Sequence, residues 1–390
     1  MLKVIVDATP ITTKPTGVGF HLTNLINCLA KEQERIGFKL SIFYQPTLKK
    51  WLNRDFSLPR FINTERLEEK IIFPYPVRLS NWFLGNVPQI FPWLLDNKLQ
   101  SYDIFHGTNF CVYPNSQTAR VMNLYDLAFL CYPQFVDSVA GQYQQRVEQC
   151  LPWTDLIIVS SKSTKQDLIK YLRLSPEKVW VTPLASRYNQ EYLQGINLTQ
   201  VKQSLNYDFS QPYLLFVSTI EPRKNILTLI KAFNYLKQKY NIEQNLILVG
   251  RKGWQYRPVF EAIEQSPYSK HIYHLDYLCD RSVATFYKCA TAFIYPSYYE
   301  GFGLPVLEAM TLGTPVVCAN TSSLPEVAGD AALLIEPEKP GELAEAIYKI
   351  IDSSILRELL IERGYKQAAK FSWAATAQKT IEAYSAINRT

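Results

Sequence analysis

A segment near residue 300 carries the residues best suited to chemistry, in the sequence PSYYEGFGLPVLEAMTLGTP (residues 296–315). Glu300 lies in the loop before a predicted helix and Glu308 one turn inside it, while Gly301 and Gly303 allow the intervening backbone to turn sharply. Free N–H groups at a helix start bind anions, and the proline in this turn suits the first helical position. The segment therefore suits a ligand with phosphate and hydroxyl groups. On spacing alone, a strand–turn–helix junction with two incidental acids is an equal alternative.

A pair of adjacent cations lies in a second segment, FVSTIEPRKN (residues 216–225). Arg223 and Lys224 follow a predicted strand and precede a predicted helix, so we expect them at the same edge of the sheet as the first segment. Two cations at such a place neutralise the charge of a diphosphate leaving group, as a metal ion does in other enzymes. The alternative is a solvated basic pair at the end of a loop.

The elements that must position these residues follow an α/β pattern, because short β-branched runs alternate with longer amphipathic ones. Expected strands cover residues 2–6, 40–44, 103–106, 120–124, 155–160, 179–182, 213–218, 245–250, 271–274, 291–295, 315–318 and 331–335. Expected helices cover residues 17–35, 162–172, 225–240, 282–289, 305–312 and the chain from 340 to its end. Because the pattern restarts after the polar stretch 187–211, we predict two Rossmann-like domains that face each other across a cleft.

The composition excludes several classes of protein. Apolar residues make up 47% of the 390 residues and charged residues 19%, which argues against a disordered chain and predicts two globular domains. The net charge of +6 is too small to indicate a nucleic-acid partner. The seven cysteines form no CxxC pair, which indicates a reducing compartment rather than a disulfide or zinc framework. No apolar run is long enough to span a membrane, and the four prolines of stretch 71–95 forbid one straight helix. We therefore expect a cytoplasmic protein.

Four segments together resemble a known family: EPRKN (221–225), VGRKGW (249–254), YPSYYEGFGLPVLEAM (295–310) and LPEVAGDAALLIEP (324–337). They occur in the order and spacing of the retaining nucleotide-sugar glycosyltransferases of family 4 (group 1), and the chain looks most like the mannosyltransferases of that family. Glu300 and Glu308 match the E-x7-E motif of the family. The likeness covers nearly the whole chain and is looser before residue 100.

The resemblance implies a GT-B fold: an N-terminal acceptor-side domain at 1–190, a nucleotide-sugar-binding domain at 205–370, and a C-terminal helix at 371–390 that packs back toward the first domain. It also implies a retaining hexosyltransferase that uses a nucleoside-diphosphate sugar, with GDP-mannose as the best match. The acceptor would be a glycan or a lipid-linked sugar in polysaccharide or glycolipid synthesis. The family needs no bound metal or other cofactor, and the chain has no D-x-D motif.

The same resemblance implies roles for the residues singled out above. The donor diphosphate would contact Arg223 and Lys224, the donor sugar would approach Glu300, and the ribose hydroxyls would bind Glu308. Backbone contacts to the donor would come from two glycine-containing loops, namely Gly17, Val18 and Gly19, and Gly301, Phe302, Gly303 and Leu304.

One feature departs from the family pattern. Family members usually carry a His-Asp pair after the strand near residue 120, and this chain has Tyr125 and Asp126 there. A tyrosine donates a hydrogen bond but is not a cation near neutral pH. His106, after the preceding strand, is either a catalytic residue or a structural or acceptor-side one. His21 either faces the cleft or, as the favoured alternative, is a surface or packed helix residue. The catalytic candidates are therefore Tyr125, Asp126 and His106 beside Glu300, Arg223 and Lys224.

Two alternatives to a transferase stay open from the sequence. Nucleotide-sugar epimerases and glycan phosphorylases, taken as one class, share the GT-B fold, although the combined motifs match the transferases more closely. A non-enzymatic subunit that binds a nucleotide sugar would explain Tyr125 in place of the histidine.

Region 49–93 has an unusual composition, because nine aromatic residues lie beside several basic ones. This composition suits peripheral contact with the cytoplasmic face of a membrane or with a lipid-linked acceptor. A proline-rich insertion packed over the first domain is the alternative.

Overall fold

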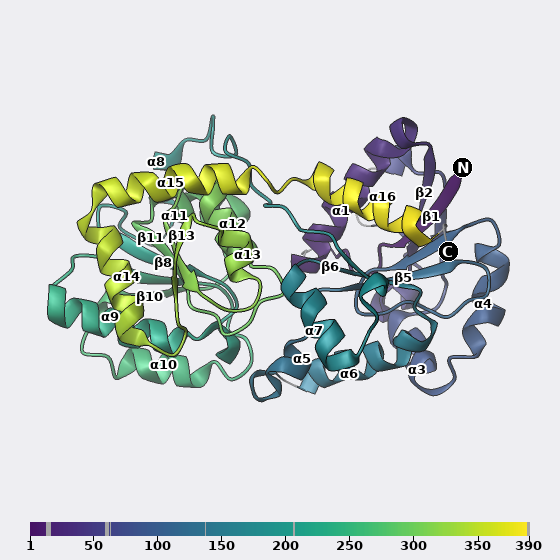
Figure 1. Cartoon of the computed structure of the whole chain (residues 1–390), viewed down its shortest axis with the longest axis horizontal. Coiled ribbons are helices and arrows are strands. Elements are labelled where there is room, and N and C mark those ends of the chain that lie inside the picture. The colour runs from purple at the N-terminus through teal and green to yellow at the C-terminus, as the bar shows by residue number, and fades with distance from the viewer. Residues whose placement is uncertain (13–16, 59–61, 63, 137, 206, 388–390) are drawn as a thin grey trace. The chain divides into compact units, whose positions relative to one another are not determined.

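The computed structural model describes residues 1–12, 17–58, 62, 64–136, 138–205 and 207–387, and the chain divides into two compact α/β units (Figure 1). The first unit contains Met1–Leu130, Ser138–Leu184 and Trp373–Thr390, and the second contains Cys131–Asp137 and Ala185–Ser372. The segment Cys131–Asp137 thus belongs to the second unit although it interrupts the first in sequence. The limits 1–190, 205–370 and 371–390 remain our proposal for independent folding domains.

The first unit is built on a seven-stranded parallel sheet with the order β3-β2-β1-β4-β5-β6-β7. Its strands are β1 (Leu2–Asp7), β2 (Phe38–Tyr44), β3 (Lys70–Ile72), β4 (Ile104–Gly107), β5 (Ala119–Leu124), β6 (Leu156–Val159) and β7 (Val179–Val181). Val4 pairs with Leu40 on one side and Ile104 on the other, and all three side chains are fully buried. Parallel strands that are covered by helices on both faces have continuous apolar sequences, and most of these strands could therefore be predicted from the sequence.

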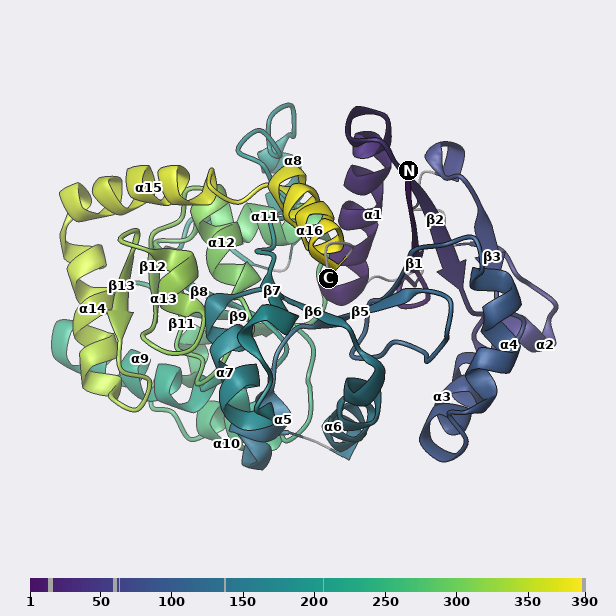
Figure 2. The ribbon, with the colours of Figure 1, turned by 45° about the vertical axis from the view of Figure 1, so that its right-hand side comes forward.

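Helices of the first unit are α1 (Gly17–Ile36), α2 (Leu48–Leu52), α3 (Val77–Asn86), α4 (Ile90–Leu99), α5 (Ala128–Cys131), α6 (Ser138–Cys150), α7 (Lys162–Leu172) and α16 (Trp373–Ile387). The expected return of the C-terminal helix is confirmed, because α16 packs against α1 and β6 (Figure 2). Thr376 of α16 donates to the carbonyl of Pro183 at 2.7 Å, and Tyr384 is fully buried. Within the described residues, no helix is both long and apolar enough to cross a membrane.

The second unit is built on a six-stranded parallel sheet with the order β10-β9-β8-β11-β12-β13. Its strands are β8 (Tyr213–Val217), β9 (Asn245–Val249), β10 (Ile272–Leu275), β11 (Ala292–Tyr295), β12 (Val316–Ala319) and β13 (Ala332–Ile335). Its helices are α8 (Leu198–Gln203), α9 (Ile226–Tyr240), α10 (Arg257–Glu264), α11 (Asp280–Cys289), α12 (Leu304–Thr311), α13 (Leu324–Ala328), α14 (Pro340–Asp352) and α15 (Ser354–Ala368). The two parallel sheets confirm the predicted α/β class.

Short 3-10 turns complete the described elements, at Thr64–Arg66, Pro133–Phe135, Leu151–Trp153, Pro176–Lys178, Pro222–Lys224 and Ser269–His271.

Each sheet has one place where the strand order reverses, between β1 and β4 in the first unit and between β8 and β11 in the second. Loops that leave the carboxyl ends of two such strands diverge, and ligands of open α/β sheets bind in the resulting crevice. In the second unit, the loop after β8 carries the EPRKN segment and the loop after β11 carries EGFGLP. The topology therefore brings together two segments that lie more than seventy residues apart.

Candidate functional site

Four ionisable side chains form a buried cluster at the reversal point of the second sheet. Lys224 donates to Glu300 Oε1 over 2.6 Å, and the Arg223 guanidinium lies 3.3 Å from Glu300 Oε2. Arg223 also donates to Glu221 Oε1 over 2.8 Å. Because Lys224 is 5% exposed and Glu300 7% exposed, a solvated basic pair with incidental acids is excluded. The structure thus brings together Arg223, Lys224 and Glu300, which the sequence had placed in two separate motifs.

The backbone around the cluster ties the two loops into one structure. Asn225 starts α9 with φ at +56°, and its side chain donates to the carbonyls of Pro296 and Pro337. The N–H of Tyr298 donates to the carbonyl of Arg223, and Arg223 donates to the carbonyl of Tyr299. These bonds link the loop after β8 to the loop after β11, so the position of each cation is set by both segments.

The charges of the cluster support one another. Burial raises the pKa of Glu300, but Lys224 and Arg223 outweigh it, and the net pKa lies below the ordinary value. Burial and Arg223 would lower the pKa of Lys224, but Glu300 and Tyr295 reverse that effect, and the net pKa is raised. Burial raises the pKa of Glu221, against the opposing effect of Lys224 and Arg223. Lys224 and Glu300 are therefore an ionised pair near neutral pH.

Lys224 keeps capacity for a ligand. An ammonium group has three N–H donors. Two of them are used within the described chain, by Glu300 and by the hydroxyl of Tyr295 at 3.1 Å. The third donor suits an anionic oxygen such as that of a phosphate, since charge-assisted hydrogen bonds are the strong ones.

The loop before α12 is held by hydroxyl groups. The Ser323 hydroxyl lies 2.8 Å from the carbonyl of Glu300 and 2.7 Å from that of Phe302. The N–H of Glu300 donates to Ser322 Oγ over 2.8 Å. Phe302 is buried, Gly303 caps α12, and Leu304 begins the helix. The loop Gly301–Leu304 is therefore a fixed turn at the carboxyl edge of the sheet, and its contact with a ligand stays a prediction.

Gly303 is the position of this loop where a side chain is least tolerable. Its φ is +105°, and a Cβ atom would lie 2.7 Å from Leu324 Cδ2. We expect Gly303→Ala to destabilise the second unit by about 1–3 kcal/mol through backbone strain. Gly341→Ala in α14 is the matched control, because a Cβ there meets nothing within 4 Å and should be neutral or slightly stabilising. Differential scanning calorimetry compares them, and equal melting temperatures for the two variants would contradict this expectation.

The second carboxylate of the E-x7-E motif has a different partner. Glu308 is 3% exposed, and its two oxygens accept from Arg187 Nε at 2.8 Å and Arg187 Nη2 at 3.0 Å. The hydroxyl of Tyr287 lies 3.4 Å from Glu308 Oε2. Sequence reasoning missed Arg187, which lies in the polar stretch taken as the domain boundary. No local motif marks it, because the contact spans 121 residues of sequence.

Of the candidates in the first unit, His106 lies within β4, and Tyr125 and Asp126 lie directly after β5. Tyr125 donates to the carbonyl of Thr108 over 2.8 Å, and the Asp126 carboxylate accepts from the N–H of Ala128. His106 is fully buried, with one ring nitrogen 2.7 Å from the Tyr384 hydroxyl and the other bonded to the amide oxygen of Asn123. Burial lowers the pKa of His106 to about 4, so its ring is neutral near pH 7. These contacts favour the structural alternative for His106, because both ring nitrogens hold elements of the unit together.

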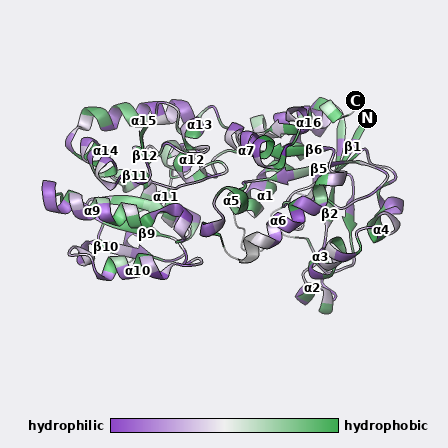
Figure 3. Ribbon diagram, turned by 60° about the horizontal axis from the view of Figure 1, so that its bottom comes forward, coloured by the Kyte–Doolittle hydropathy of each residue, from purple (hydrophilic) through white to green (hydrophobic). Residues whose placement is uncertain are grey.

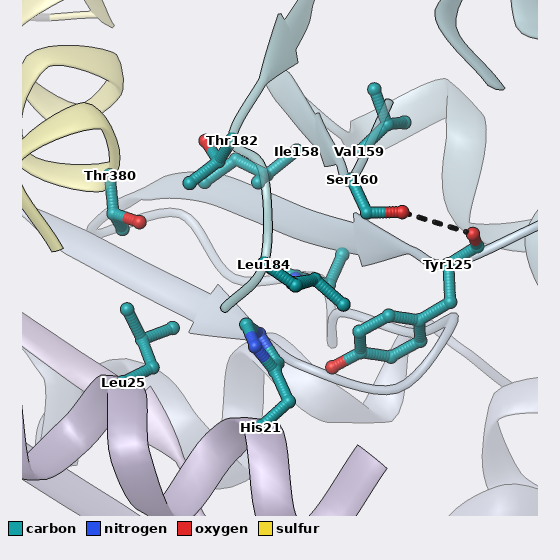
Figure 4. Close-up of a pocket in the computed structure, with 10 residues that line it drawn as sticks. His21, Leu25, Tyr125, Ile158, Val159, Ser160, Thr182, Leu184 and Thr380 are labelled. Atoms are coloured by element: carbon teal, nitrogen blue, oxygen red, sulfur yellow. Dashed lines mark hydrogen bonds between the residues drawn. The ribbon is translucent and has the colours of Figure 1, made fainter. Parts of the chain in front are cut away.

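A small cavity adjoins Tyr125 (Figure 4). It is lined by His21, Leu25, Asn123, Tyr125, Ile158, Val159, Ser160, Thr182, Leu184 and Thr380. His21 is 2% exposed and packs edge-on to Tyr125 at 5.6 Å between ring centroids, as expected of a packed helix residue. The cavity holds about 10 Å³, which has room for one water molecule and none for a sugar.

Gly17, Val18 and Gly19 form the first turn of α1, as the sequence predicts. Their contact with phosphates stays a prediction, and the preceding residues 13–16 lie outside the described part of the chain.

Comparison with known proteins places this geometry in a family. The model of the family "Glycosyl transferases group 1" matches residues 199–367. The O-antigen chain mannosyltransferase B of Escherichia coli is 32% identical over 286 residues, which cover 73% of this chain and 74% of that protein. The MMP alpha-(1->4)-mannosyltransferase of Mycolicibacterium hassiacum is 29% identical over 247 residues, covering 62% of this chain and 56% of that protein.

Solved structures show the same fold. Sucrose-phosphate synthase from Thermosynechococcus elongatus superposes with a TM-score of 0.75 at 18% identity, over 100% of both chains. The Anabaena protein Alr3699/HepE, solved in complex with UDP-glucose, superposes with a TM-score of 0.70 at 16% identity, over 99% of this chain and 100% of that one. The relatives, the two parallel sheets and the returning α16 agree, and the chain belongs to the group 1 glycosyltransferases, family 4, as a hexosyltransferase with the GT-B fold.

Proposed function

We propose that the chain is a retaining mannosyltransferase that uses GDP-mannose and a glycan or lipid-linked acceptor in polysaccharide or glycolipid synthesis. The observation that carries the proposal is the buried cluster of Arg223, Lys224 and Glu300 at the reversal point of the second sheet. Two of the relatives named above are mannosyltransferases, which supports mannose as the sugar. Family membership favours a transferase over the epimerase and the binding subunit.

In the proposed reaction, the bond between the sugar C1 and the phosphate oxygen breaks while a bond from C1 to the acceptor oxygen forms on the same face. The acceptor proton passes to the leaving phosphate. Arg223 and Lys224 stabilise the negative charge that grows on the diphosphate. Preorganised cations have their strongest effect in a site that excludes water. Glu300 holds both cations in place and lies where the sugar of the donor would approach.

Glu308 would accept hydrogen bonds from the hydroxyls of the donor ribose. In the first unit, we propose that Gly17, Val18 and Gly19 close over the phosphates and that Tyr125 and Asp126 face the sugar. Tyr125 has a raised pKa, chiefly through burial, and is therefore neutral. Its one O–H proton is donated to the Thr108 carbonyl, so in this role its oxygen would accept a hydrogen bond from a sugar hydroxyl.

A thermal-shift screen against GDP-mannose, UDP-glucose and ADP-glucose tests the donor. A ligand present at 100 times its dissociation constant stabilises the protein by about 2.7 kcal/mol, which a melting curve resolves easily. We expect GDP-mannose to give the largest shift. A larger shift with a UDP- or ADP-sugar would contradict the choice of GDP, and no shift with any of them would contradict donor binding.

We also propose that α2, α3 and α4 make peripheral contact with a membrane surface. Trp51, Leu52, Trp82 and Trp93 are 41%, 67%, 56% and 78% exposed, and Figure 3 shows hydrophobic residues on α2 and α4. Basic residues accompany them at Lys49, Lys50 and Arg54. Other aromatic side chains of the region, such as Phe73 and Phe91, are buried, so part of it is a packed insertion.

Flotation with liposomes rich in anionic lipid tests this contact. We expect the wild-type protein to float with the vesicles and the double variant Trp82→Ser, Trp93→Ser to bind at least several-fold less, because aromatic side chains and basic residues act together at such surfaces. A Tyr277→Ser variant is the control, since Tyr277 is 59% exposed in the second unit. Wild-type protein that stays at the bottom of the gradient would rule the contact out.

A further inference from the structure

Arg187 has a geometry that goes beyond an ordinary ion pair. Its Nε and Nη2 atoms donate in parallel to the two oxygens of Glu308, at 2.8 and 3.0 Å. Its remaining terminal nitrogen, Nη1, donates to Asp280 Oδ1 over 2.8 Å. A guanidinium that makes a two-bond fork fixes the plane of the carboxylate it holds, which a lysine cannot do.

The arginine is itself held from several sides. Its guanidinium lies over the ring of Tyr188, with 5.1 Å to the ring centroid. The hydroxyl of Tyr188 donates to the carbonyl of Asp280, at the start of α11, over 3.1 Å. Arg187 is thus fixed by α11 on one side while it fixes a side chain of α12 on the other. A side chain so restrained orients its partner with little freedom left.

Glu308 needs such a partner. It lies in α12 among Val306, Leu307, Ala309 and Met310, each of which is at most 1% exposed. An ionised carboxylate in these surroundings is costly unless a cation and hydrogen bonds compensate it. A carboxylate has about four acceptor positions. Arg187 uses one on each oxygen, which leaves one open position on Oε1 and, on Oε2, one that meets only the long 3.4 Å contact from the Tyr287 hydroxyl.

We propose that Arg187 is a positioning residue, which orients the Glu308 carboxylate so that its remaining acceptor positions receive the 2′- and 3′-hydroxyls of the donor ribose. Arg187 thereby determines the preference for a ribonucleotide over a dideoxynucleotide. Asp280 supports it by holding the outer nitrogen of the guanidinium. This inference rests on the proposed role of Glu308 and adds the residue that makes that role selective.

The test compares the affinities of GDP and 2′,3′-dideoxy-GDP, and of UDP and 2′,3′-dideoxy-UDP, by calorimetry on the full chain. For whichever of GDP and UDP binds more tightly, the wild type should bind the ribonucleotide at least about tenfold more tightly than its dideoxy form. The two forms differ only in the hydroxyls that would donate hydrogen bonds to Glu308. In Arg187→Met and Arg187→Lys, this ratio should fall below about threefold, while the affinity for the dideoxy form changes by less than about threefold. Asp280→Asn should lower the ratio by a smaller factor.

Arg363→Met is the matched control, because Arg363 also pairs with an aspartate of the second unit but is 44% exposed and lies at 3.7 Å from its partner. It should leave the ratio unchanged. Three results would overturn the role of Arg187 but leave that of Glu308: an affinity ratio retained in both Arg187 variants, an equal loss of affinity for the ribonucleotide and its dideoxy form, or tighter ribonucleotide binding in the variants. A wild-type ratio near one would overturn it together with the proposed role of Glu308. The lysine variant keeps the charge, so it serves as the second measurement if the methionine variant does not fold.

Discussion

Replacing Lys224 by alanine is expected to lower the rate of sugar transfer by at least about 100-fold, because a preorganised cation at a leaving group accelerates a reaction by about that factor. Lys224 is almost fully buried and has one N–H donor beyond those that Glu300 and Tyr295 accept. The variant also removes the cation that holds down the pKa of Glu300 most strongly, so the pKa of this carboxyl should rise. Steady-state kinetics with a saturating acceptor measure the loss.

The control for this variant is Lys231→Ala, since Lys231 lies on the exposed side of α9 in the same unit. It should leave transfer within about twofold of the wild type. Circular dichroism and a melting curve separate a loss of activity from a loss of fold. Near-normal turnover of a folded Lys224→Ala protein would contradict the placement of the diphosphate.

Replacing Glu308 by alanine should also lower transfer by at least about 100-fold. The change removes the acceptor proposed for two ribose hydroxyls and leaves Arg187 with Asp280 as its remaining carboxylate partner among the described residues. The loss should appear chiefly as weaker donor binding, because the ribose is bound in the ground state as well as in the transition state. Donor-dependent kinetics separate KM from kcat.

A matched control is Glu358→Ala on an exposed position of α15. Glu308→Gln adds a second comparison, because the amide keeps one acceptor oxygen and the size of the side chain but loses the charge. We expect its activity to lie between those of the wild type and the alanine variant. Unchanged KM for the donor in Glu308→Ala would remove this residue from the site.

Much of the fold could be predicted from local signals. Helix α7 was expected at residues 162–172 and has these bounds, because Ser161 caps it by accepting from the N–H of Thr164. Most strands of both sheets were recognised because buried parallel strands have short, continuous apolar sequences. Strand β3 was missed, because three residues, Lys70–Ile72, at the edge of a sheet carry no periodicity. Helices α3 and α4 were missed because the prolines of this region obscure a helical pattern, although one straight helix was correctly excluded.

The candidate site could be predicted only where its residues lie in contiguous motifs. Arg223, Lys224 and Glu300 each follow a strand, and the order of the strands brings them together. Arg187 could not be predicted, because it meets Glu308 through the packing of distant elements. The same holds for segment Cys131–Asp137 of the second unit, where Phe135 stacks on Tyr298 at 5.0 Å between ring centroids.

The most direct test is a calorimetric titration of GDP-mannose, with a chelator present, into the wild-type protein and Lys224→Ala. If buried cations neutralise the donor diphosphate, the wild type should bind one equivalent without a divalent ion, and the variant should bind at least about 100-fold more weakly. Equal affinity of the two proteins, or wild-type binding that appears only after a divalent ion is added, would contradict that claim.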